Sequence, residues 1–434
     1  MTSDAPPARE PMYGPEFAAD PGAVYARLRR HGPFGPVELA PGVPATLVVG
    51  YEAALQVLRD PATFPKDARR WEKDVPADCP VLPMMGYRPN CLMTDGGVHA
   101  RLRGAVTDSL ERIDTGALRD HVERTADDLI DRFTTAGEAD LVARYARALP
   151  LLVLIEMFGC PREIADRIVT GMSGIFEGLD AERANAEINR GVADLIALKR
   201  ARPGADVTTW MLNHPAELTE DELGQQLVVL IGAGAEPEQN LIANTLRLLL
   251  ADDRFAGDLS GGSLPVEDAL DEVLWTDPPM ANYGVTYPER DLVLGDALLP
   301  ADQPVVVSFA AANTDPAMAS DHRTGNRAHL AWSTGPHTCP AKGPARLIAS
   351  VAIERLLDRL PDLELAVPAA ELEWRPGPFH RALAALPVRF PPVPVPDRTE
   401  PAGAPVAGPV PPAAAPAPRR ARWWDPLVRW WNGR

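Results

Sequence analysis

The chain has 434 residues, of which 46% are hydrophobic, and a formal net charge of −17 at pH 7. This hydrophobic content is enough for a large buried core, and the negative charge argues against nucleic-acid binding by the whole protein. No unbroken apolar stretch has the length of a membrane span, so we expect a cytoplasmic protein. The four cysteines, Cys79, Cys91, Cys160 and Cys339, lack paired metal-binding spacing and are expected to be reduced.

Helical patterns dominate the chain. We expect two short helices, 18–30 and 51–59, on either side of a strand at 45–49. Longer helices are predicted at 99–110, 117–134, 141–158, 161–178, 182–200, 220–251, 266–275 and 344–360. Strands are predicted at 291–299, 305–308 and 384–390. Many helices with few strands and no repeated βαβ unit indicate a mainly α protein of the α+β class.

The sequence predicts one large folded unit with distinct ends. Residues 13–390 contain no internal linker, and residues 1–12 are expected to be a flexible N-terminus. Residues 391–418 are rich in Pro and Ala, which is typical of a disordered linker. Residues 419–434 form an Arg- and Trp-rich C-terminal segment. Such a segment suits an anionic membrane surface or an acidic protein partner, and the sequence leaves these two roles and no role open.

One cysteine stands apart by its context. Cys339 ends the run WSTGPHTC that begins at Trp332, after a Gly/Pro turn and before the helix predicted at 344–360. Such a turn would hold a thiolate still, with backbone N–H groups around its sulfur, as a single axial haem ligand requires. A buried and inert small residue is the alternative.

Two helical regions carry groups that suit a haem. His99 and Arg103 lie four residues apart, and therefore on one helix face, where two cationic donors can grip carboxylates such as haem propionates. A solvated basic face is the alternative. In the helix predicted at 220–251, the small residues Ala233 and Gly234 interrupt an apolar run, so that a flat cofactor can approach the backbone.

A proline follows these small residues in the same helix. Pro237 removes one helical hydrogen bond and clashes with the preceding turn, at a cost of about 3 kcal/mol, so a kink is expected. The acids on either side, Glu236 and Glu238, are able to organise water and protons. A kink with no chemical role is the alternative.

Taken together, these regions resemble the cytochrome P-450 superfamily of the bacterial soluble type. Its ligand loop has the pattern aromatic-Gly-x-Gly-x-His/Arg-x-Cys-x-Gly. The matching residues are Trp332, Gly335, His337 and Cys339, with Ser333 and Ala341 in place of two glycines. The resemblance implies a cytochrome P-450 fold with haem b between the central helix and the cysteine loop. It makes Cys339 the iron ligand, His99 and Arg103 the propionate ligands, and Ala233, Gly234, Trp332, Gly335, His337 and Ala341 further haem contacts.

Two departures from the family concern chemistry and stability. Pro237 stands where the family has a Thr that handles protons during oxygen activation, so Glu236 and Glu238 become the catalytic candidates. The family's Glu-x-x-Arg ends in Trp275 here, as in an actinobacterial subgroup with Glu-x-x-Trp. A buried Glu272 then needs to be protonated, solvated or paired with another cation, for which Arg323 and Arg327 are the candidates.

The resemblance implies an oxidoreductase that oxidises a small apolar molecule with electrons from a ferredoxin-like donor. Because the Thr is missing, peroxide-driven or other non-monooxygenase chemistry stays open. The residues expected to line the substrate pocket, unless they belong to the core, are Met84, Met85, Tyr87, Met280, Tyr283 and Phe379. The alternative function is a non-catalytic or regulatory haem protein, recruited by residues 419–434 to the inner membrane face or to a GTPase-associated complex.

Overall fold

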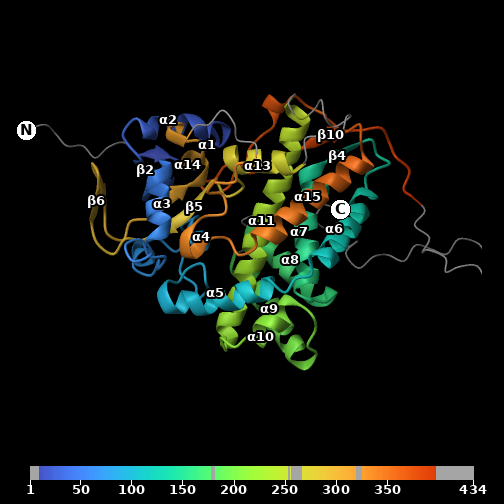
Figure 1. Ribbon diagram of the computed structural model, residues 1–434, viewed down its shortest axis with the longest axis horizontal. Helices are drawn as coiled ribbons and strands as arrows, with labels where there is room; N and C mark the ends of the chain where they lie inside the picture. Colours follow the sequence, from blue (N-terminus) through green and yellow to red (C-terminus); the bar gives the residue numbers. More distant parts are fainter. Residues whose placement is uncertain (1–8, 177–180, 253–254, 256–265, 319–324, 397–434) are drawn as a thin grey trace, which may run out of the picture.

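A computed structural model of the chain describes residues 9–176, 181–252, 255, 266–318 and 325–396 (Figure 1). The Arg- and Trp-rich segment 419–434 and the linker beyond residue 396 lie outside the described residues, so the roles expected for them stay predictions. Among the residues described, no helix combines the length and the apolar character that crossing a membrane requires.

The described chain has a β-rich side and a helical side (Figure 1). A five-stranded sheet in the order β1-β2-β3-β8-β5 organises the β-rich side. Its strands are β1 Glu10–Pro11, β2 Phe34–Ala40, β3 Val43–Val48, β5 Asn282–Thr286 and β8 Val305–Ser308. The helices on this side are α1 Pro15–Ala19, α2 Pro21–Arg29, α3 Tyr51–Arg59, α4 Leu82–Met85 and α14 Phe309–Asn313. The hairpin β6 Leu292–Leu294 and β7 Ala297–Leu299 extends from it.

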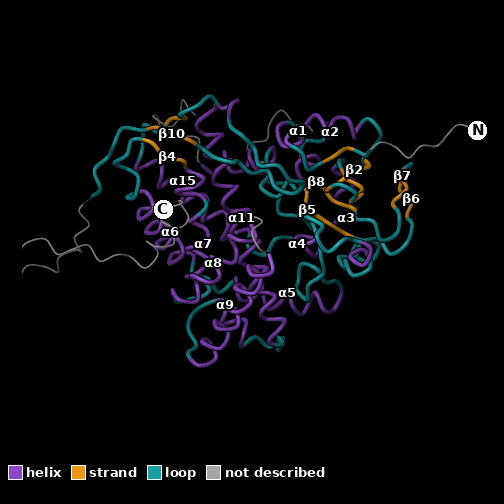
Figure 2. Tube along the Cα trace, turned by 180° about the vertical axis from the view of Figure 1, so that it is seen from behind, coloured by secondary structure: helices purple, strands orange, loops and turns teal. Residues whose placement is uncertain are grey.

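The helical side contains the other α-helices of the described chain (Figure 2). They are α5 Gly96–Leu110, α6 Thr115–Ile130, α7 Ala148–Met157, α8 Arg162–Phe176, α9 Ala181–Ala201, α10 Val207–Leu212, α11 Glu220–Ala251, α13 Val266–Thr276 and α15 Lys342–Arg359. A small sheet borders them, in the order β4 Glu138–Asp140, β10 Pro387–Arg389 and β9 Glu364–Leu365. Together the two sides confirm the α+β class with a helical majority.

Helix α11 is the central helix of the fold (Figures 1 and 2). A capping box starts it, since the Thr219 hydroxyl accepts from the Glu222 N–H and the Glu222 side chain accepts from the Thr219 N–H. Its helical structure continues through Pro237 to Ala251. The proline therefore does not break the helix.

Several boundaries differ from the predictions for physical reasons. The helix expected at 18–30 is two helices, because Asp20 caps α2 and Pro21 begins it. The helix expected at 141–158 begins with a π-helical turn, Val142–Ala146. Within the N-terminus expected to be flexible, β1 pairs in parallel with β2. Strands β2 and β5 were not predicted, because neither shows a clean alternation of apolar and polar residues.

Trp275 fills a buried site between α13 and the segment that leads to the cysteine loop. The side chain is 3% exposed, its indole N–H donates to the Asn326 carbonyl at 2.7 Å, and its ring meets that of His329 edge to face at 5.7 Å between centroids. Burial lowers the pKa of His329 to about 4, so this aromatic pair is uncharged at neutral pH.

The charged cluster beside Trp275 is organised around Asp271. Arg327, one of the two cations predicted for Glu272, instead places its Nε 2.9 Å from Asp271. Arg346, which follows the cysteine loop in sequence, pairs with both Asp271 and Glu267. The other candidate, Arg323, lies outside the described residues. Arg327 therefore pairs with Asp271, and how Glu272 is stabilised stays a prediction.

Trp275→Arg is expected to destabilise the protein, although it restores the family's Glu-x-x-Arg pattern. The change removes the packing of a buried indole, which costs about 3–5 kcal/mol when an aromatic side chain is lost, and it desolvates a guanidinium. Trp275→Phe keeps the ring contact with His329 and loses the bond to Asn326, so it should cost about 1 kcal/mol. Thermal and urea unfolding of the two variants measure the difference, and a higher melting temperature for Trp275→Arg would refute this account.

Candidate functional site

The cysteine loop has a backbone shaped by two left-handed residues. Gly335 has φ +73°, and a Cβ there would lie 2.5 Å from the Leu58 carbonyl oxygen, so glycine is required. Ser333, at the position of a family glycine, also has a positive φ of 59°, which is uncommon for a residue with a side chain. The loop closes where the Cys339 N–H donates to the Trp332 carbonyl at 2.8 Å.

Cys339 differs from the other cysteines in its surroundings. Cys79, Cys91 and Cys160 are buried, whereas Cys339 is only partly so. Burial raises the pKa of the Cys91 thiol to about 11 and that of Cys160 to about 12. Burial also raises the pKa of Cys339, but the backbone N–H of Ala341 and the charge of Arg103 act to lower it. A partly accessible sulfur with N–H and cationic neighbours suits a metal-ligand thiolate.

Three of the predicted cofactor-binding residues come together beside this loop. The His99 and His337 rings contact each other at 4.1 Å between centroids, tilted by 49°, and an Arg103 guanidinium nitrogen donates to the Thr338 carbonyl. His337 Nε2 lies 3.2 Å from a carboxylate oxygen of Asp95, although burial lowers the His337 pKa. Residues more than 230 positions apart in sequence thus form one basic cluster, the arrangement that a carboxylate-bearing cofactor requires.

One face of α11 is less buried than the rest of that helix. Leu230, Ala233 and Pro237 follow a spacing of three and four residues and so share this face. Ala233 is exposed in the middle of the helix, whereas Ile231 and Ala235 are buried. Gly234 faces α7, since a Cβ there would lie 3.0 Å from the Leu154 side chain. Its glycine therefore serves close packing of α11 on α7, and Ala233 lies on the accessible face.

The two acids that flank Pro237 have opposite environments. Glu236 forms an ion pair with Arg375 and accepts a long bond from the Asn240 amide at 3.5 Å. Burial would raise the Glu236 pKa, but the charges of Arg375 and His380 outweigh it, and the pKa is lowered. Glu236 is therefore an ionised carboxylate.

Glu238 is a buried acid without a cation beside it. It is 6% exposed, and its Oε1 has no hydrogen-bond partner in the described part of the chain. Burial raises its pKa well above the ordinary value, while the backbone N–H of Ala349 on α15 opposes that shift. Its charge would also raise the pKa of Cys339, so the two groups are close enough to interact. Burial thus favours the protonated, uncharged form of Glu238.

Some of the residues predicted to line a substrate pocket belong to the core instead. Met85 and Phe379 are 1% and 4% exposed and pack in the cluster around the five-stranded sheet. Tyr283 is half-buried, its hydroxyl donates to the Met84 carbonyl at 2.7 Å, and its ring meets Phe379 edge to face at 5.6 Å. These contacts join three of the predicted pocket segments.

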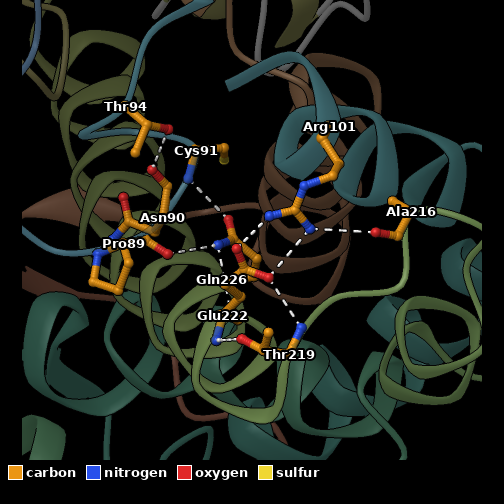
Figure 3. Close-up of polar contacts among 9 residues, drawn as sticks. All are labelled: Pro89, Asn90, Cys91, Thr94, Arg101, Ala216, Thr219, Glu222 and Gln226. Carbon is orange, nitrogen blue, oxygen red and sulfur yellow. Dashed lines mark hydrogen bonds and ion pairs between the residues drawn. The ribbon is translucent and has the colours of Figure 1, made fainter. Parts of the chain in front are cut away.

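The segment from Pro89 to Thr94 connects this region with α5 and α11 (Figure 3). The Gln226 side chain on α11 accepts from the Cys91 N–H at 3.0 Å. On the other side, the Cys91 carbonyl accepts from His99 Nδ1 at 2.9 Å. The segment is thus fixed between the two helices that carry the predicted acids and the predicted propionate ligands.

Sequence reasoning missed Arg375, Asp95 and Gln226. Arg375 is 139 residues from Glu236 in sequence, and no local pattern around Arg375 predicts the contact between them. Asp95 lies at the N-cap of α5 and Gln226 within the long apolar helix α11, so each reads as an ordinary helix residue. Long-range contacts of this kind have no signal in a single sequence.

These residues fit a haem b. A thiol, a cluster of His and Arg donors, and the accessible face of α11 surround one region. Two buried polar atoms there, the indole N–H of Trp332 and Glu238 Oε1, lack partners among the described residues, as expected for groups that serve a bound molecule. Ala341 has φ −101°, so the loss of the family glycine there leaves the backbone unstrained.

Comparison with known proteins identifies the group to which the chain belongs. No protein-family model matches it. It is 34% identical over 405 residues to cytochrome P450 monooxygenase PikC of Streptomyces venezuelae, covering 90% of this chain and 96% of that protein. It is 32% identical to cytochrome P450 107B1 of Saccharopolyspora erythraea, with coverages of 86% and 96%.

Solved structures agree with these relatives. CYP154C4 from Streptomyces sp. ATCC 11861 superposes with a TM-score of 0.80 at 28% identity, covering 88% of this chain and 98% of that chain. CYP154A1 from Streptomyces coelicolor superposes with a TM-score of 0.77 at 28% identity, covering 88% and 100%. With its fold, its cysteine loop and relatives that match along nearly their whole length, the chain belongs to the cytochrome P450 superfamily of haem-thiolate monooxygenases.

Proposed function

We propose that this P450 oxidises a small, mostly apolar organic molecule with electrons from a ferredoxin-like protein, and that Glu238 donates the proton that Pro237 cannot. The observation that carries the proposal is the buried Glu238 Oε1, which has no partner among the described residues and lies one residue after the proline. Relatives named as monooxygenases and hydroxylases support the enzymatic reading over a non-catalytic haem protein.

The residues around the site divide the work of holding the cofactor. Haem, when bound, supplies the activation of oxygen and its transfer to the substrate. Cys339 would ligate the iron, and His99, Arg103 and His337 would hold the propionates through charge-assisted hydrogen bonds. The haem faces would contact Ala233 on α11 and the cysteine loop. The loop residues in that contact are Trp332, Gly335 and Ala341, and Gly234 supports α11 from behind.

Proton handling would fall to the two acids on α11. A proline has no hydroxyl and no N–H to donate. A protonated carboxylic acid has one O–H donor, and burial raises the pKa of Glu238, which favours that form. Glu236, ionised beside Arg375, can accept a proton but has none to give at neutral pH. Glu238 therefore holds the transferable proton on its carboxyl group.

We infer the substrate class from the names of the relatives and from the residues expected to line the substrate pocket. Two similar proteins are named 6-deoxyerythronolide B hydroxylase and 2-hydroxy-5-methyl-1-naphthoate 7-hydroxylase. Tyr283 and Met84, joined by a hydrogen bond, give an apolar surface with few polar groups, which favours a mostly hydrocarbon substrate.

Cys339→Ala should abolish the absorption band of the reduced, carbon-monoxide-bound haem-thiolate protein, because the alanine cannot ligate iron. Cys79→Ala, Cys91→Ala and Cys160→Ala should keep the band, since these thiols are buried and none belongs to the loop. The spectrum of each purified variant decides the assignment, and a band that survives in Cys339→Ala would exclude Cys339 as the ligand.

Pro237→Thr should raise the fraction of electrons that end in oxidised product. The threonine restores a backbone N–H and a hydroxyl on the accessible face of α11, and it removes a proline whose cost inside a helix is about 3 kcal/mol. Product formed per NADPH consumed measures the effect, with a ferredoxin and its reductase supplied. Unchanged coupling together with slower peroxide-driven turnover would instead favour peroxide as the native oxidant.

Glu238→Gln should stabilise the protein at neutral pH and slow turnover by about 10²-fold, the scale of general acid catalysis. A carboxyl whose folded pKa is raised costs more stability as the pH rises above its unfolded value of about 4.3. The melting temperature of the variant should therefore exceed that of the wild type at pH 7, and the difference should shrink toward pH 4. An unchanged rate would show that another group supplies the proton.

A further inference from the structure

The six residues Pro89–Thr94, here called the strap, are tied to α11 by one amide side chain. Gln226 is fully buried, with 0% exposure. Its Oε1 accepts from the Cys91 N–H at 3.0 Å, and its Nε2 donates to the Glu222 carbonyl at 3.2 Å and to the Pro89 carbonyl at 3.4 Å (Figure 3). A buried amide with both its donor and its acceptor groups in use has a fixed orientation.

The strap, held in place by Gln226, in turn orients the ring of His99. The Cys91 carbonyl accepts from His99 Nδ1 at 2.9 Å, so Cys91 is held by its N–H on one side and by its C=O on the other. The second nitrogen of His99, Nε2, lies 3.2 Å from the Pro336 carbonyl in the cysteine loop. The chain of contacts therefore runs from Gln226 through Cys91 and His99 to the loop that carries the ligand.

We propose that Gln226 is a positioning residue for His99, acting through the backbone of Cys91. It fixes the ring so that one nitrogen is committed to the strap and the other faces the cofactor side. The inference rests on the proposed role of His99 as a propionate ligand. Because Nδ1–H is given to a carbonyl, Nε2 donates to a propionate only when both ring nitrogens carry protons. A ring fixed in this way presents the same nitrogen to its ligand at every encounter, which reduces the entropy lost on binding.

A separate contact keeps α5 and α11 together when Gln226 is changed. Arg101, on α5, donates to a Glu222 carboxylate oxygen at 3.1 Å and to the Ala216 carbonyl at 3.2 Å (Figure 3). Glu222 also belongs to the capping box of α11. Because this link is independent of the strap, the effect of a substitution at Gln226 is confined to the strap and to His99.

Amide hydrogen exchange of the haem-free full-length protein tests the first step. Gln226→Met retains the length and helix preference of the side chain and removes its hydrogen bonds. Amides of residues 90–94 should exchange about tenfold faster, whereas those in the middle of α11 should not change. The matched control is the neighbouring half-buried Gln225→Met, which should match the wild type. Equal exchange of the strap in all three proteins would overturn the proposal.

A double-mutant cycle on haem loss tests the second step. Transfer of haem to an excess of apomyoglobin is measured for wild type, Gln226→Met, His99→Ala and the double variant. Gln226→Met alone should speed haem loss about fivefold to tenfold, the scale of one hydrogen bond. In the His99→Ala background it should have no further effect. Factors that multiply in the double variant would show that Gln226 does not act through His99.

The haem-loss experiment distinguishes failure of the propionate role of His99 from failure of the positioning role of Gln226. If His99→Ala leaves the rate of haem loss unchanged, the role of His99 as a propionate ligand is wrong. If His99→Ala speeds haem loss but the two factors multiply, only the inference about Gln226 is wrong. The exchange measurement in the haem-free protein is independent of both outcomes, because it reports the strap itself.

Discussion

Helix α11 is anchored in two different hydrophobic cores, and Pro237 lies between the two anchors. Leu227 and Ile231 pack with α5, α8 and α9, whereas Leu246 and Leu249 pack with α6, α13 and α15. Each core holds its own half of the helix in place, so the backbone stays helical where a proline costs about 3 kcal/mol. The less buried face of α11, with Leu230, Ala233 and Pro237, is therefore held in a fixed position between the two cores.

The same helix explains how two acids close in sequence have different protonation states. Residues two positions apart on a helix point in nearly opposite directions, about 200° around the axis. Glu236 therefore reaches the loop that carries Arg375, and Glu238 reaches α15, where the described residues offer it no cation. The pKa of Glu236 is lowered and that of Glu238 is raised, and pKa values pushed apart in this way are the usual means by which a pair of acids divides between two roles.

Sequence reasoning predicted what is periodic or local in this protein. The bounds of Tyr51–Arg59, Glu220–Ala251 and Val305–Ser308 agree with the predictions, because each has a clear apolar pattern with definite start and stop signals. His99 and His337 were named as cofactor-binding residues from two separate motifs, but the contact between their rings was not predicted. The partner of Asp271 and the environment of Glu238 were beyond reach, because both depend on contacts between residues far apart in the chain.

The backbone at Ser333 has the left-handed conformation to which glycine is best suited, although serine stands there. A side chain in the left-handed region carries a strain of about 1 kcal/mol or more, yet hydrogen bonds at Leu330 and Trp332 hold the loop around it in the geometry that glycine normally provides. A search pattern that demands glycine by letter at positions 333 and 341 would pass over this loop. A pattern defined by dihedral angles and contacts would find it. Divergent haem-thiolate proteins are therefore better sought by the backbone conformation of this turn than by its amino-acid sequence.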